Sequence, residues 1–277
     1  MEYNHELQCI DTQEKAYLLG QIYGDGYASD CNKSYKAGLA SIIDDKLLYE
    51  QLHILFPFFK LVIYPYKPNI IRLENYKKAL YEDLVALGMK SDKTICDRTG
   101  EFHFPNLPEE LEHHFIRGYF DADGAFWYPT RKRSRNNLHT EFGCNTPNFL
   151  EAINQILIKN GIMFTKYHRF KKGGNGKYYE SFGLFSSNRE ISVKFADYIY
   201  KDSIIHLERK YELAYKEKDL RPLASEVYGS CPYCNSNNIE RRGTRQMKTR
   251  LMRRLLCRDC GKLFSVPMPT SEVTQSE

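Results

Sequence analysis

The segment Tyr17-Leu-Leu-Gly-Gln-Ile-Tyr-Gly-Asp-Gly26 decides the fold, because it returns later in the chain as Phe115-Ile-Arg-Gly-Tyr-Phe-Asp-Ala-Asp-Gly124. Both copies read as helices that end at Asp-Gly, and we expect the glycine to take the left-handed conformation that often terminates helices. Such a repeat within one chain predicts two similar halves.

In both halves, the repeated segment and the stretch after it predict the same order of elements: helix, two strands, helix, two strands, helix. The second helix of each half opens with Asp44-Asp45 or Thr146-Pro147, residue types that favour helix starts. The last two strands of each half read as hairpins. The delimited strands cover residues 35–43, 61–66 and 70–73, then 138–144, 162–170 and 178–185, and the closing helices cover 75–88 and 188–200.

A unit of about a hundred residues buries its sheet poorly when it is alone. We therefore expect the halves to pack around a pseudo-twofold axis through the repeated helices. Those helices carry small residues one turn apart, which let two helix backbones approach closely: Gly20, Gly24, Gly118 and Ala122.

Asp25 and Asp123 stand at the end of a helix, where a carboxylate opposes the helix dipole by roughly 0.3–1 kcal/mol. Because both copies place a carboxylate at this unfavourable position, we expect a bound cation to compensate its charge. If the helices pack along their small residues, the two carboxylates converge and supply the hard oxygen ligands that Mg²⁺ prefers. Metal-assisted phosphodiester hydrolysis uses such a site. A single Asp-Gly could equally be a hairpin turn.

The paired segments resemble the motifs that name the LAGLIDADG homing endonucleases, and the resemblance covers nearly all of residues 10–215. Residues 119–124, Tyr-Phe-Asp-Ala-Asp-Gly, keep the ending of the motif, whereas Tyr23 replaces the first acid in the first copy. The resemblance implies that Asp25 and Asp123 bind the catalytic metal. It also implies an α+β, duplicated αββαββα fold with two saddle-shaped antiparallel sheets in the major groove of double-stranded DNA.

The resemblance further implies a site-specific double-strand break with short 3′ overhangs, made with two or three Mg²⁺ ions between the motif aspartates. A basic residue is expected near each metal site, and we assign Lys93 and Lys210 to these roles. Cations on and before the strands of the sheets are expected to contact DNA: Arg72, Arg131, Arg133, Arg135, Lys166, Arg169, Lys171, Lys172 and Lys177.

Near the C-terminus, residues 231–234 and 257–260 both have the spacing Cys-x2-Cys. Four thiolates at this spacing suit one structural Zn²⁺, held by Cys231, Cys234, Cys257 and Cys260. The other four cysteines, Cys9, Cys31, Cys96 and Cys144, fit small buried residues.

The excess positive charge of the chain lies in this C-terminal region. Residues 228–277 hold nine Lys or Arg against four Asp or Glu, and the whole chain has a net charge of +5. A basic tail suggests a polyanionic partner. The module resembles the zinc ribbons of some bacterial transposases, and its arginines are expected to contact phosphate: Arg241, Arg242, Arg245, Arg250, Arg253 and Arg254.

These patterns divide the chain into a first half (1–104), a second half (105–217), a linker (218–230), a zinc ribbon (231–268) and a disordered tail (269–277). We expect a monomer with no protein partner, because nothing in the sequence implies one. No export signal or membrane span is expected, which places the protein inside a bacterial or phage-infected cell or an organelle. Two alternatives stay open: an RNA-binding intron maturase and a non-cleaving DNA-binding regulator of the same fold.

Overall fold

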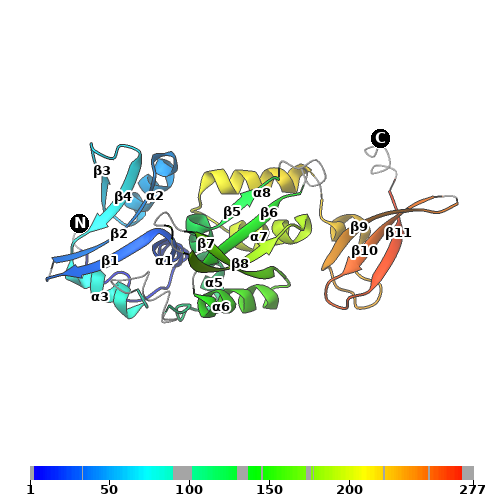
Figure 1. Ribbon diagram of the computed structural model, residues 1–277, viewed down its shortest axis with the longest axis horizontal. Helices are drawn as coiled ribbons and strands as arrows, with labels where there is room; N and C mark the ends of the chain where they lie inside the picture. Colours follow the sequence, from blue (N-terminus) through cyan, green and yellow to red (C-terminus); the bar gives the residue numbers. More distant parts are fainter. Residues whose placement is uncertain are drawn as a thin grey trace. The chain divides into compact units, whose positions relative to one another are not determined.

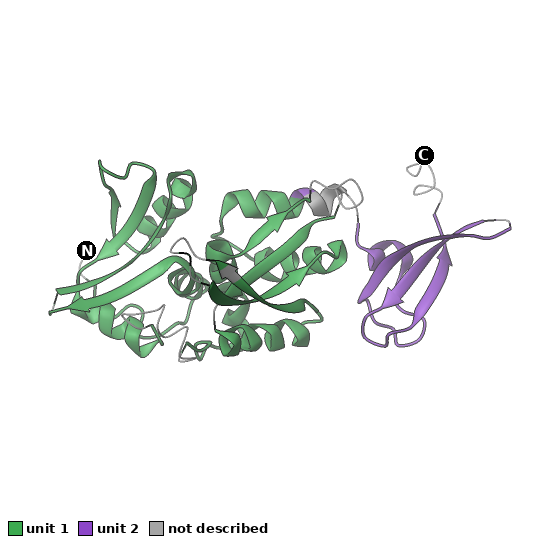
Figure 2. Ribbon diagram, viewed as in Figure 1, with its two compact units in different colours: residues 1–215 green, residues 216–277 purple. Residues whose placement is uncertain are grey.

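The computed structural model describes residues 3–32, 34–89, 102–129, 137–144, 146–172, 176, 178–220, 222–248 and 250–269. The chain divides into two compact units, residues 1–215 and 216–277 (Figure 2). The first unit contains both copies of the repeated segment, and the second contains the cysteine pairs.

The first half of unit 1 builds one four-stranded antiparallel sheet in the order β1-β2-β4-β3 (Figure 1). Its elements are α1 (Gln13–Asp25), β1 (Gly26–Cys31), β2 (Ser34–Ile42), η1 (Ile43–Asp45), α2 (Lys46–Leu55), β3 (Lys60–Ile63), β4 (Ile70–Asn75) and α3 (Lys78–Ala86). Thr12 caps α1 by accepting a hydrogen bond from the Lys15 backbone N–H at 3.3 Å.

The second half repeats this topology with a sheet in the order β5-β6-β8-β7. Its elements are α5 (Glu109–Asp123), β5 (Ala125–Trp127), β6 (His139–Cys144), α6 (Pro147–Lys159), β7 (Thr165–Lys172), β8 (Tyr178–Ser186), α7 (Arg189–Tyr200) and α8 (Glu208–Leu220). The predicted α+β class and the αββαββα order are confirmed. Only the second of the first two strands of each half matches a range predicted from the sequence, because β1 and β5 begin at or directly after the motif glycine.

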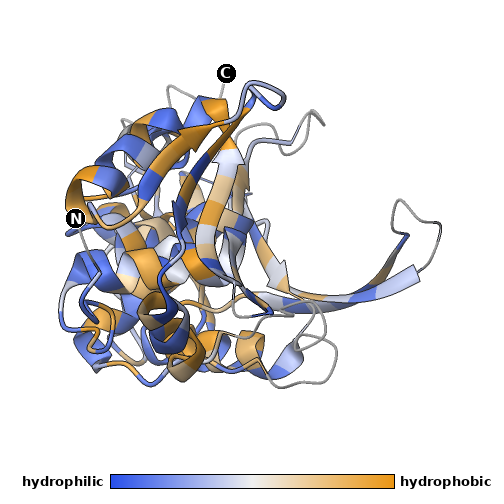
Figure 3. Ribbon diagram, turned by 90° about the vertical axis from the view of Figure 1, so that its left-hand side faces the viewer, coloured by the Kyte–Doolittle hydropathy of each residue, from blue (hydrophilic) through white to orange (hydrophobic). Residues whose placement is uncertain are grey.

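One hydrophobic core runs through both halves, from Tyr3 to Ala214. Figure 1 shows α1 and α5 together in the middle of unit 1, with one sheet on either side. Blue and orange residues alternate along the helices in Figure 3, as expected of elements that bury one side. Among the described residues no helix is both long and apolar enough to cross a membrane.

Unit 2 is a three-stranded antiparallel sheet in the order β11-β10-β9, preceded by a short helix. Its elements are α9 (Ala224–Tyr228), β9 (Ile239–Gln246), β10 (Leu251–Cys257) and β11 (Leu263–Pro267). Ala224 is fully buried in the small core that also holds Cys231 and Cys257. The segment predicted as a linker therefore contains the end of α8 and a helix of this module. The tail from residue 270 lies outside the described residues.

Candidate metal and nucleic-acid site

The two motif helices touch through their backbones. A Cβ atom added to Gly20 would lie 2.1 Å from the Phe115 carbonyl oxygen, and one added to Gly118 would lie 2.1 Å from the Tyr17 carbonyl oxygen. One turn further on, a Cβ on Gly24 would lie 2.3 Å from the Ala122 Cβ. A Cβ at Gly20, Gly24 or Gly118 would not fit this approach, so the small residues set the distance between the helices.

The same packing brings the C-terminal ends of α1 and α5 together, and these ends are Asp25 and Asp123. An added Cβ on Gly24, the neighbour of Asp25, would lie 3.5 Å from Asp123 Oδ2. Both carboxylates also act electrostatically on the ammonium group of Lys210. Asp25 is half-buried and Asp123 is exposed. Hard oxygen ligands from both helices thus gather at one accessible place, which fits Mg²⁺ chemically.

The motif glycines do not take the left-handed conformation that we expected. Gly26 has φ −81° and Gly124 has φ −88°, both in the extended region. A Cβ on Gly26 would lie 2.3 Å from the Ile22 carbonyl oxygen, and one on Gly124 would lie 2.2 Å from the Phe120 ring. Glycine is needed because the strand leaves the helix directly against the last helical turn.

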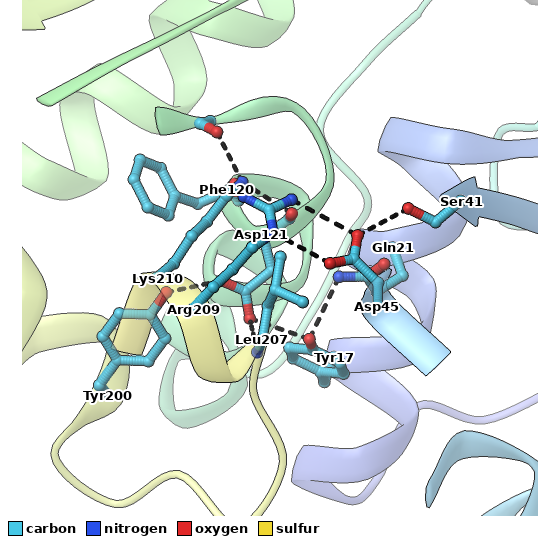
Figure 4. Close-up of polar contacts among 11 residues, drawn as sticks. Tyr17, Gln21, Ser41, Asp45, Phe120, Asp121, Tyr200, Leu207, Arg209 and Lys210 are labelled. Atoms are coloured by element: carbon cyan, nitrogen blue, oxygen red, sulfur yellow. Dashed lines mark hydrogen bonds and ion pairs between the residues drawn. The ribbon is translucent and has the colours of Figure 1, made fainter. Parts of the chain in front are cut away.

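Lys210 lies in the first turn of α8 and is buried. Its Nζ donates to three backbone carbonyl oxygens, those of Phe120 at 2.8 Å, Asp121 at 2.7 Å and Gly124 at 2.6 Å (Figure 4). Burial lowers the pKa of Lys210 to about 8, although the negative charge of Asp121 acts to raise it. The structure therefore places the predicted basic residue at the end of α5 beside Asp123. Lys93 lies outside the described residues.

Asp121, the first acid of the motif, has a role that the sequence analysis missed. Its buried carboxylate accepts hydrogen bonds from Tyr17 Oη at 2.9 Å, Tyr200 Oη at 2.6 Å and the Leu207 N–H at 2.8 Å. Burial raises the pKa of this carboxyl group above its ordinary value. The equivalent position of the first motif copy holds Tyr23 and not an acid. Since only one half has an acid there, this acid is not a metal ligand that both halves share, and the sequence already carried that signal.

The outward face of the first sheet holds a second missed acid. Glu74 on β4 is buried. Its carboxylate accepts hydrogen bonds from Tyr64 Oη at 2.8 Å and Tyr76 Oη at 2.6 Å, and it forms an ion pair with Lys36 at 2.9 Å. Burial raises its pKa, but these contacts outweigh burial and lower the pKa to about 2. Successive residues of a strand point to opposite faces of the sheet. Because Leu73 occupies the core face of its strand, the next residue, Glu74, could have been assigned to the outward face from the sequence.

The predicted DNA contacts of the sheets differ in their surroundings. Arg72 is half-buried, and its guanidinium lies 5.9 Å from the centre of the Tyr64 ring. Lys166 pairs with Glu151 at 2.7 Å, and Arg169 pairs with Glu141 at 2.6 Å. Lys172 is exposed on β7. The remaining predictions fall on residues whose side chains the structure does not describe: Arg131, Arg133, Arg135, Lys171 and Lys177.

In unit 2 the four cysteines converge. The Sγ atoms of Cys231, Cys234, Cys257 and Cys260 all lie within 4.8 Å of one another. The pair Cys231–Cys260 is 3.7 Å apart and Cys234–Cys257 is 3.5 Å apart. Four sulfurs around zinc, with bonds of about 2.3 Å, lie about 3.8 Å apart. The cluster therefore has the ligands and the spacing to hold a zinc ion.

The two Cys-x2-Cys turns share one backbone geometry. Asn235 N–H donates to Cys231 O at 2.9 Å, and Gly261 N–H donates to Cys257 O at 3.0 Å. Asn235 and Gly261 both have a positive φ, 58° and 70°. Residue types that tolerate the left-handed region thus close each turn and aim its thiols at one point.

Three of the six predicted ribbon arginines make contacts within unit 2. Arg241 stacks over Tyr228 at 5.6 Å, and Arg253 Nε donates to Tyr228 Oη at 3.2 Å, so both attach α9 to the sheet. Arg242 pairs with Glu240 at 2.8 Å. Arg245, Arg250 and Arg254 are exposed.

The prediction that the other cysteines are buried is wrong for two of them. Cys9 and Cys31 are exposed, and Cys144 is half-buried. Cys9 lies in the loop before α1, and Cys31 ends β1 at the tip of its hairpin, where neither packs into the core. Cys96 lies outside the described residues.

Comparisons with known proteins give one family match and several similar folds. Residues 110–227 match the model of the LAGLIDADG-like domain. Solved structures with a similar fold include mesophilic variants of the homing endonuclease I-DmoI, with 17% identity, a TM-score of 0.45 and coverage of 69% of this chain and 97% of the other. The LAGLIDADG meganuclease I-AabMI bound to uncleaved DNA has 14% identity, a TM-score of 0.48 and coverage of 76% and 91%. Comparison with curated proteins gives no match. Residues 110–227 are therefore similar in sequence to the LAGLIDADG-like domain family.

Proposed function

We propose that the protein is a Mg²⁺-dependent, site-specific DNA endonuclease of the LAGLIDADG type that cuts both strands of a long target. The observation that carries the proposal is that α1 and α5 end at Asp25 and Asp123 and pack so closely that a Cβ on Gly24 would lie 3.5 Å from Asp123 Oδ2. Two carboxylates at helix C-termini repel each other and oppose the helix dipoles, so a divalent cation between them relieves both costs.

Asp25 and Asp123 would hold the magnesium ions. When bound, Mg²⁺ would supply positive charge to the phosphate oxygens and lower the pKa of a coordinated water. The chain itself fixes the two carboxylates through the glycine contacts of α1 and α5. It also presents two sheets whose outward faces carry tyrosines and cations, side chains that reach phosphates and base edges.

The cysteine cluster of unit 2 would hold one structural zinc ion. A closed four-thiolate site leaves no coordination position for chemistry, so its effect is on folding. The exposed arginines of β9 and β10 would then contact the DNA backbone, which contributes affinity without reading sequence.

The test is a cleavage assay with Mg²⁺ on duplexes that carry the flanks of the encoding locus. We expect Asp25→Asn and Asp123→Asn to abolish the double-strand break while DNA binding largely persists, because each change removes ligand charge but little surface. Asp11→Asn is the matched control, since this exposed carboxylate precedes the other end of α1 and pairs with Lys15. It should cut normally.

Full activity of either motif variant would refute the proposed metal site. A wild-type protein that binds the duplex without cutting it would point to a DNA-binding regulator. Preference for the intron RNA of the locus over duplex DNA would point to a maturase.

A further inference from the structure

Residues 207–210, at the start of α8, contact one element from each half, α5 and η1 (Figure 4). The Leu207 N–H donates to Asp121 of α5 at 2.8 Å. Arg209 reaches Asp45 of the first half, and Lys210 reaches the end of α5. One turn of helix thus joins the segment that bears Asp123 to the opposite half of unit 1.

The contact with the first half is a two-pronged ion pair. Arg209 Nε lies 2.9 Å from Asp45 Oδ1, and an Nη2 of the same guanidinium lies 3.4 Å from Oδ2. Asp45 is buried and also accepts a hydrogen bond from Ser41 Oγ at 2.8 Å. Ser41 therefore orients the carboxylate that Arg209 contacts at both oxygens, and this geometry makes the pair directional.

The contact with α5 uses the whole donor capacity of Lys210. An ammonium group has three N–H donors, and the carbonyl oxygens of Phe120, Asp121 and Gly124 lie within 2.8 Å of Nζ. The last carbonyls of a helix have few partners within the helix, and Lys210 donates to two of them, those of Asp121 and of Phe120, which also accepts the Gly124 N–H at 2.7 Å. Its direct effect is thus on the backbone on both sides of Asp123.

Asp121 completes the arrangement from the other side. Its carboxylate receives the Leu207 N–H at the start of α8, while Lys210 of α8 donates to the carbonyls at the end of α5. Each helix end therefore carries a group of the opposite charge to its own dipole end, as favourable capping requires. Neither helix end can shift without breaking the contacts of the other.

We propose that the first turn of α8 is a bracket that fixes the Asp123 end of α5 against the first half, with Arg209 and Lys210 as positioning residues. The inference rests on the proposed nuclease function, because it concerns the position of one of its two metal-binding carboxylates. It assigns Lys210 an action through the α5 backbone in place of contact with the reacting phosphate.

The bracket holds Asp123 and not Asp25, so loosening it should affect the two strands unequally. The strand whose cut depends on Asp123 should slow, while the other strand is cut as before. Nicked duplex should then accumulate several-fold above the wild-type level, with the nick always in the same strand.

The experiment uses the full chain and a target duplex with a different label on each strand. The variants are Arg209→Gln, Arg209→Lys and Asp45→Asn. Lys159→Gln is the matched control, because it breaks an exposed ion pair with Glu109 at the opposite end of α5. Hydrogen exchange of peptides spanning residues 118–127 is measured in parallel, and it needs no DNA.

We expect Arg209→Gln and Asp45→Asn to raise both the nicked fraction and the exchange of this segment. Arg209→Lys should restore much of the wild-type behaviour, and Lys159→Gln should leave it unchanged. Wild-type cutting with an unaltered strand ratio and unaltered exchange in Arg209→Gln would overturn the inference. A wild-type protein that cuts no duplex would instead overturn the proposed function.

Lys210→Met tests the second positioning residue. A group that acts through the α5 backbone should, when removed, raise the hydrogen exchange of residues 118–127 in the free protein and increase nicking in the same strand as Arg209→Gln does. Slower cleavage with wild-type exchange and an unaltered strand ratio would mean that Lys210 acts on the reacting groups, and would overturn its positioning role. If this variant does not fold, the Arg209 and Asp45 variants still decide the proposal.

Discussion

Replacing Gly118 with Ala adds one methyl group where α5 crosses α1. Helix propensity alone predicts a gain of about 1 kcal/mol in the free energy of unfolding. The structure predicts the opposite sign, because the new Cβ would lie 2.1 Å from the Tyr17 carbonyl oxygen, a backbone atom that cannot rotate away. To restore ordinary contact the helices must separate by roughly 1 Å, which forfeits a quarter to a half of their close dispersion energy.

Overpacking of a tight core costs about 1–3 kcal/mol. The rigid backbone obstacle places Gly118→Ala at the upper end, and after subtracting the propensity gain we expect a net loss of about 2 kcal/mol. For a unit of this size that lowers Tm by about 4–8 °C. Urea and thermal unfolding followed by far-ultraviolet circular dichroism measure both quantities.

A compensating pair sharpens this prediction. Gly24→Ala alone should destabilise, since its Cβ would lie 2.3 Å from the Ala122 Cβ. Combining it with Ala122→Gly moves the methyl group from one helix to the other and should recover most of the loss. Unchanged or raised stability of Gly118→Ala, or no recovery in the pair, would refute the claim that close backbone contact sets the helix spacing.

Three further predictions concern the sheet and the ribbon. The Glu74 carboxyl has its pKa lowered to about 2 in the folded protein, so its contribution is complete above its ordinary pKa of 4.5 and is lost as the pH falls toward 2. Glu74→Gln should therefore lower stability at neutral pH by about 2 kcal/mol and flatten its pH dependence in that window, and unfolding curves at several pH values will show whether it does. Replacing Cys257 and Cys260 with Ser should reduce bound zinc from one ion per chain to none and should unfold unit 2 alone. Metal analysis measures the zinc and proteolysis measures the unfolding. Retained zinc would contradict the four-Cys site. A chain truncated near Pro222 should still cut its target DNA. The slope of log K for DNA binding against log salt should become shallower by about 0.9 for each phosphate that the ribbon no longer neutralises. An equal slope would mean that the ribbon does not touch this DNA.

The elements that the sequence predicted well depend on local patterns. The repeated helix, the strands that follow it and the paired Cys-x2-Cys turns are each encoded within a few neighbouring residues, through periodicity, spacing and capping. The twofold recurrence of the Asp-Gly helix end was enough to place Asp25 and Asp123 at equivalent positions. The roles of these two residues as metal ligands remain a prediction.

The features that sequence patterns did not reveal depend on partners far away in the chain. Leu207 contacts Asp121 and Lys210 contacts the end of α5 across more than eighty residues, so no local spacing encodes these bonds. The assignment of α9 to the ribbon likewise depends on Tyr228, which Arg241 and Arg253 of two different strands approach.

The sequence by itself determined the duplicated architecture and the chemical types of the candidate ligands, because both are written in repeats and residue identities. Only the tertiary structure decided how the groups are used. It directed Lys210 to backbone carbonyls, buried Asp121 among hydroxyl donors and gave the motif glycines a steric purpose in place of a left-handed turn. The physical reason is that a charge or a glycine acquires its function from the atoms packed against it, and folding brings those atoms from distant parts of the chain.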